Sequence, residues 1–255
     1  MFKIISTTLG MPQITVQQTQ SDWKKFLGMD SGYSGTIPMM KPGTIVDAVD
    51  DVFGVARFIL AYGVASLQIG DVVSIGAGYA TTRLAAAGKG ICAVSMAANT
   101  DSTALSWFCV MGQVPIRAAT MTLGAILYSS ATTGSLTSTV TAGQGVTGAH
   151  CVLAASGTVT TKTVQTVNGG YELSVPDLEG LYVGQSVSGT GIAGGSTITD
   201  LGLGGTMLGR QASARAGKVY LSAAMTATGS VTGTFAHPST FGTAMLAHPV
   251  AAGAV

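Results

Sequence analysis

The chain of 255 residues holds few side chains suited to acid–base, nucleophilic or metal chemistry: 11 acidic residues, three histidines and three cysteines. His150 directly precedes Cys151, which resembles a thiol beside its base. Neighbouring residues on a strand point to opposite faces, so these two side chains are not expected to meet as nucleophile and base. His237 and His248 are isolated, and each precedes a proline. The histidines therefore predict no catalytic site.

The acidic residues also give no clear indication of a catalytic or metal-binding site. Asp47, Asp50 and Asp51 form a cluster, but the D-x-D-x-D-G spacing of a calcium loop is missing, and we expect a solvated loop there. Asp177 and Glu179 form a close pair, and mutating them would test a polysaccharide hydrolase or lyase. We predict no catalytic, cofactor-binding or metal-binding residues, and a protein that is not an enzyme.

The cysteines Cys92, Cys109 and Cys151 lie far apart in apolar, strand-like runs, with no C-x-x-C spacing. Unpaired cysteine is among the most buried residue types. We therefore expect three buried free thiols.

The composition indicates surfaces that are covered by other protein. Only 9% of the residues are charged and the net charge is +1, whereas roughly a quarter are charged in an ordinary soluble domain. A surface so poor in charge favours association, and the scattered Lys and Arg residues lack the basic footprint of a nucleic-acid binder.

The most apolar window, residues 52–65, is too short for a membrane span and carries Arg57. Residues 1–5 do not resemble a secretory signal, so we expect a protein made in the cytoplasm, with no nucleic-acid or membrane partner.

A glycine-containing pattern recurs along the chain. It reads Leu67-Gln-Ile-Gly70-Asp-Val-Val, Met121-Thr-Leu-Gly124-Ala-Ile-Leu and, with one polar residue before the last valine, Leu181-Tyr-Val-Gly184-Gln-Ser-Val. Glycine tolerates positive φ, so each copy predicts a tight turn that leads into a strand.

Residues 1–50 contain several prolines and polar runs, and they predict an extended N-terminal arm with a short helical segment near Ser21. An arm cannot bury its own apolar groups, so its large side chains are candidate contacts with a neighbouring protein. These candidates are Trp23, Phe26, Tyr33, Met39 and Met40. The equally weighted alternative is that they fold back on their own barrel.

The rest of the chain predicts two β-domains. Residues 51–156 are short apolar runs separated by glycine turns, which are typical of a small barrel. Residues 157–235 are rich in Thr, Ser, Gly and Val, and their initial period-two alternation predicts an antiparallel module. Residues 236–255 return to the apolar character of the first block. We predict an all-β fold: a small β-barrel of residues 51–156 plus 236–255, an inserted antiparallel β-module at 157–235, and the N-terminal arm.

Two segments resemble known families. One family of small β-barrels carries two sequence motifs, an aGDvv turn and a G-x-x-L-Y-x-S-A-T-x-G-x-L loop. The first motif is matched by Leu67-Gln-Ile-Gly-Asp-Val-Val, and the second by a loop that begins at Gly124. The matching loop residues are Gly124, Leu127, Tyr128, Ser130, Ala131, Gly134 and Leu136. On these residues the middle of the chain resembles the tailed-phage capsid decoration, or cement, proteins. The stretch Tyr182-Val-Gly-Gln-Ser-Val-Ser-Gly-Thr-Gly-Ile192 is similar to small β-modules of phage fibres.

The first resemblance implies a virion structural protein that binds the outer surface of the phage head and stabilises it. Its partners would be the major capsid protein and further copies of itself, most plausibly as a homotrimer. The inserted module would project outward, where its Thr and Ser faces suit a host-surface glycan. The alternative is a tail or fibre component in which this module is a glycan-binding adhesin.

Overall fold

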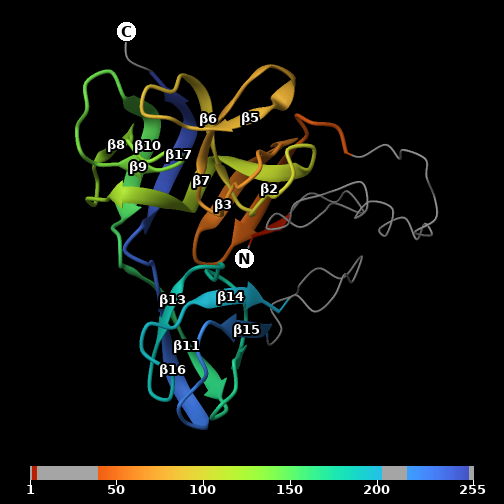
Figure 1. Ribbon diagram of the computed structural model, residues 1–255, viewed down its shortest axis with the longest axis vertical. Coiled ribbons are helices and arrows are strands. Elements are labelled where there is room, and N and C mark those ends of the chain that lie inside the picture. Colours follow the sequence, from red (N-terminus) through yellow and green to blue (C-terminus); the bar gives the residue numbers. More distant parts are fainter. Residues whose placement is uncertain (1, 5–39, 203–216, 253–255) are drawn as a thin grey trace, which may run out of the picture.

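The computed structural model describes residues 2–4, 40–202 and 217–252, and the regular secondary structure in these ranges is almost entirely β-strand (Figure 1). The strands form one sheet of 11 strands and one of six. A single 3-10 turn, η1 (Ala77–Tyr79), is the one helical element among the described residues. No helix within these ranges is long and apolar enough to cross a membrane. The prediction of an all-β fold is confirmed.

The larger sheet closes into a barrel. Six strands pair in a ring, in the order β7, β9, β8, β10, β17, β6 and back to β7. Their bounds are β6 (Gly90–Ser95), β7 (Leu105–Thr120), β8 (Ile126–Ser129), β9 (Leu136–Thr137), β10 (Gly145–Leu153) and β17 (Phe241–Ala251). At 16 residues, β7 is long enough to pair with several neighbours along its length. Closure gives every ring strand a paired neighbour on both sides, so the ring has no open edge.

Five further strands extend the barrel sheet. β1 (Lys3–Ile4), β2 (Ile45–Asp50) and β3 (Gly54–Tyr62) join at β7, while β4 (Val72–Ile75) and β5 (Thr81–Arg83) join at β6. Phe2 is buried, and its ring lies 6.0 Å from that of Phe53 and 5.1 Å from that of Phe58. Residues 2–4 and 45–50 thus belong to the barrel sheet. This corrects the prediction that all of residues 1–50 form an arm, and residues 5–39 lie outside the described part of the chain.

The barrel core follows from strand alternation. On β7, Trp107, Cys109, Val114 and Ile116 point inward and are fully buried, and they pack with inward residues of β10 and β17. All three cysteines are free and buried, as predicted. A separate small cluster around Phe108 packs on the other face of β7.

The recurring glycine pattern forms the same turn in all three copies. Gly70, Gly124 and Gly184 have φ values of 80°, 78° and 93°. In each copy the residue after the glycine donates its N–H to the carbonyl three positions earlier: Asp71 to Gln68 (3.1 Å), Ala125 to Thr122 (3.1 Å) and Gln185 to Tyr182 (3.3 Å). Strands β4, β8 and β13 (Ser186–Ser188) follow directly. The predicted turn that leads into a strand is confirmed.

The second sheet is the inserted module. It has the strand order β13, β16, β11, β12, β15, β14, with bounds β11 (Thr158–Thr166), β12 (Glu172–Val175), β14 (Ile198–Leu201), β15 (Gly217–Leu221) and β16 (Gly229–Ala236). Hydrogen bonds from Val187 to Ser196 and from Ile198 to Gln185, each 2.9 Å, nearly close this sheet as well. Its strands lie between β10 and β17 in sequence, yet β10 and β17 pair with each other. Figure 1 shows the module end to end with the barrel.

Candidate interaction surface

The groups that could do chemistry are kept apart. His150 is exposed whereas Cys151 is buried, so the two side chains lie on opposite faces of β10, as predicted. Burial raises the pKa of the Cys92 thiol to about 11 and also raises the pKa of Cys109 and Cys151. Within the described ranges, no three or more His, Cys, Asp or Glu side chains gather as a metal site would require.

The cluster of Asp47, Asp50 and Asp51 is not the solvated loop that we predicted. Asp47 lies on β2 and its carboxylate pairs with Arg57 on β3 at 2.8 Å. Asp50 is 1% exposed. Its Oδ1 accepts the amide of Val52 at 2.9 Å, and its Oδ2 accepts the amide of Gly180 at 3.1 Å. The prediction was wrong for Asp47 and Asp50, because β2 continues to Asp50 and the carboxylate of Asp50 reaches the module. Asp51 follows in the β2–β3 turn and is exposed.

A buried polar junction joins the module to the barrel. Tyr182 Oη lies 2.6 Å from His237 Nδ1, and His237 Nε2 lies 2.7 Å from Thr243 Oγ1. Tyr182 belongs to the module, Thr243 to β17, and His237 to the connection between β16 and β17. On the other side of the junction, Glu179 Oε2 accepts the amide of Asp51 at 3.1 Å. The sequence analysis treated His237 as isolated, because its partner in the module, Tyr182, is 55 residues away along the chain.

Burial fixes the protonation of this junction. Desolvation lowers the pKa of His237 to about 4 and raises the pKa of Tyr182. At neutral pH the imidazole is therefore uncharged, with one ring nitrogen as donor and the other as acceptor. Both ring nitrogens of His237 thus have a hydrogen-bond partner, Tyr182 on one side and Thr243 on the other, and no group in this row is charged. Such an arrangement suits a structural role.

The acidic pair in the module is also engaged. Asp177 pairs with Lys162 and accepts the amide of Glu179 at 2.9 Å. Glu179 is 5% exposed and bonds across the junction. These contacts connect strands and domains.

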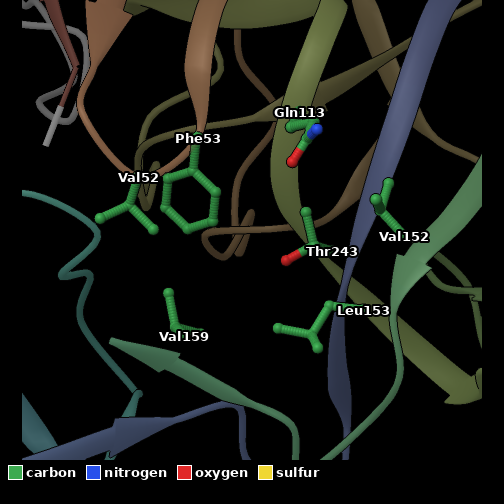
Figure 2. A pocket seen from close by; sticks show the side chains of 7 residues that line it. All are labelled: Val52, Phe53, Gln113, Val152, Leu153, Val159 and Thr243. Carbon is green, nitrogen blue, oxygen red and sulfur yellow. The ribbon is translucent and has the colours of Figure 1, made fainter. Parts of the chain in front are cut away.

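A small hollow lies beside the junction. Figure 2 shows Val159, from the module, across from Phe53 and Thr243 of the barrel. The hollow has a volume of about 150 Å³, and its lining is completed by Val52, Gln113, Val152 and Leu153. Sites for small-molecule ligands typically measure about 300–1,000 Å³, so this hollow has room for little more than one apolar side chain.

The most distinctive surface is one outer side of the barrel, which we call the uncharged wall. It consists of the exposed residues Ile91, Ile126, Thr147, His150, Met245, Ala247, His248 and Val250. Ile126 lies opposite His150, which in turn lies opposite Met245. Val250 lies between Ile91 and Thr147 in a second row. Outward positions on a barrel in water are usually polar, yet Ile91 is 56% exposed, Ile126 51%, Val250 43% and Met245 39%.

The wall arises from two stretches of sequence. Residues 118–161 and 219–255 contain no Asp, Glu, Lys or Arg. They supply β8, β9, β10 and β17, and with β6 this leaves five of the six ring strands without a charged residue. The charge-free stretches are visible in the sequence, but only strand pairing shows that they form one side of a barrel. Sequence reasoning registered the low overall charge and missed its segregation.

The candidate contact residues of the arm are largely outside the described ranges. This applies to Trp23, Phe26, Tyr33 and Met39. Met40 is described, and it is half-buried against the core of its own barrel. Its position matches the alternative in which the end of the arm folds back.

Fold and surface together define a class: an all-β protein with a closed barrel, a firmly joined β-module and an exposed wall without charge. Comparisons of the chain with known protein families, with curated proteins and with solved structures found no match.

Proposed function

We propose that the protein is a non-catalytic structural component of a virus particle, which binds the outer surface of a tailed-phage head and stabilises it. The observation that carries this proposal is the uncharged wall, because apolar side chains lined up across strands suit burial against another subunit of an assembly, either the capsid protein or a further copy of this chain. The resemblance of residues 67–156 to capsid decoration proteins supplies the identity of the assembly.

The physical effect would come from linked contacts. A closed barrel held on several capsid subunits makes each small interface depend on the others, so the effective concentration at every contact is high. Expansion of the head must then break these contacts together. The major capsid protein and further copies of this chain are the partners in this scheme, and the protein resides on the outside of the virion.

The location of the protein in virions tests this proposal. A label attached to the exposed side chain of Thr199 on β14 should decorate the whole head in electron micrographs. Purified protein should also bind heads that lack it. Label confined to the tail, with no binding to heads, would refute head binding.

A tail or fibre adhesin is the second candidate, favoured by one feature of the module. The turn after β11 exposes Val167 (58%) and Tyr171 (55%) at the end of that strand away from the barrel. Exposed tyrosine beside small polar residues suits stacking on a sugar ring. Binding of host-surface polysaccharide that is lost in Tyr171→Ser, together with a tail-only label, would favour this candidate.

A further inference from the structure

We propose that the uncharged wall is the surface through which two copies of this chain associate. The inference deepens the proposed function by assigning one of its partners to one surface. Its test uses purified protein alone, so it can fail while head binding stands.

The wall is continuous, because its side chains are cross-strand neighbours. The row of Ile126, His150 and Met245 spans three strands and continues to Gln113 on β7. Opposed side chains on one face of a sheet lie within contact distance of each other. Gln113 and Val152 also line the hollow at the junction, so the wall ends in a shallow recess.

The chemistry of the wall selects its partner. A charged group buried against it would lose hydration without gaining an ion pair, which is strongly unfavourable. The partner must therefore be apolar and free of acidic and basic side chains, with hydrogen-bonding groups that match His150, Thr147 and Gln113. A second wall meets both requirements, since each copy offers the apolar residues and the hydrogen-bond donors or acceptors that the other needs. Symmetric contacts of this kind are the commonest form of self-association.

Val55 is an exposed apolar residue of the barrel sheet that lies outside the wall. Val55 is 59% exposed on β3, two residues from Arg57, which pairs with Asp47. Val55 therefore provides a matched control: it is an exposed valine on a barrel strand, outside the wall and beside charge.

The experiment measures the oligomeric state of the purified full-length protein across a wide concentration range by light scattering and sedimentation. Wild type should self-associate, and Met245→Asp and Val250→Asp should each weaken association at least about 100-fold. Val55→Asp should associate like wild type. Far-UV circular dichroism and thermal melting would verify that each variant is folded.

A second measurement needs no charged residue in the wall. Ala247→Cys should react with a maleimide in dilute protein and be protected at concentrations where the protein associates. Val55→Cys should react under both conditions, while the three native thiols, being buried, react slowly.

Several outcomes would overturn the inference. These are a monomeric wild type, association that survives Met245→Asp and Val250→Asp, equal loss in Val55→Asp, or labelling of Ala247→Cys that ignores concentration. If wild type is monomeric but Met245→Asp abolishes binding to heads, the wall binds the capsid protein, and the proposed function stands without this inference.

Discussion

His237 shows how a single residue fixes the relation between the two β-domains. It is 1% exposed and contacts Tyr182 of the module and Thr243 of the barrel. Tyr182 also stacks on Phe241, with ring centroids 5.7 Å apart. The junction therefore depends on a neutral imidazole held between two hydroxyl groups.

The first prediction concerns acid. Because the pKa of His237 falls to about 4 on folding, the unfolded chain takes up this proton first as pH drops below about 6.5. The contribution of His237 is complete above pH 6.5 and is lost between about pH 6.5 and 4, by up to about 3 kcal/mol. Denaturant unfolding at several pH values should show this loss in wild type, and a smaller loss in His237→Gln, which cannot titrate. Parallel curves for the two proteins would contradict it.

The second prediction concerns the repeated turn. Gly70 and Gly124 both have positive φ, but a Cβ on Gly70 would lie 2.6 Å from Phe241, whereas one on Gly124 would meet nothing within 4 Å. Gly124→Ala should destabilise by about 1 kcal/mol, from backbone strain alone. Gly70→Ala adds overpacking and should cost about 3 kcal/mol. Measuring the free energy of unfolding of both variants tests this prediction. An equal loss of stability in the two would contradict it, because the packing against Phe241 would then contribute nothing.

At the scale of elements, Asp71 ties the first glycine turn to two strands. It is fully buried and accepts the amide of Gln68 at 2.9 Å. Its carboxylate lies 3.0 Å from Arg83 Nε of β5 and 3.5 Å from Arg117 Nε of β7. Burial raises the pKa of Asp71, against the opposing effect of the Gln68 amide and the two guanidinium groups.

Removing this carboxylate is the third prediction. Asp71→Ala leaves two arginines without their shared partner and should destabilise the barrel by about 3 kcal/mol. Asp47→Ala removes an exposed ion pair on β2 and β3 and should cost a small fraction of that. Thermal melting of both variants compares them. A loss in Asp47→Ala as large as in Asp71→Ala would contradict the assigned roles.

Some elements could be predicted from the sequence because their cause is local. The positive φ of Gly124 and the two-residue alternation of β11 depend on neighbouring residues. The contacts of His237 and Asp50 could not be predicted, since their partners are 55 and 130 residues away. The uncharged wall lies between these cases: its charge-free stretches can be read directly, but the pairing that joins β6, β17, β10 and β8 cannot.

At the scale of the whole molecule, the module is an insertion whose ends lie together. Thr158 of β11 pairs with Ala236 of β16, and the His237 amide donates to Gly157 at 2.9 Å. β10 and β17, which flank the module in sequence, are paired within the barrel. The barrel ring is thus complete without the module.

The fourth prediction follows from this arrangement. A chain in which residues 158–236 are replaced by a short Gly-Ser linker should fold into the barrel, at lower stability because Tyr182 and Gly180 no longer cover the junction. Under the proposed function it should still bind heads, which a pelleting assay measures. If the shortened chain folds but does not bind heads, the surface that contacts the head must lie on the module.

The most direct test of the proposed function is the temperature at which heads release DNA. Under the proposed function the chain is encoded by a tailed phage, and heads of that phage should be prepared with and without the protein. Release is then followed with a DNA-binding dye during heating. We predict release at a lower temperature without the protein, and recovery when purified protein is added back. Identical release temperatures in all three samples would contradict a head-stabilising function.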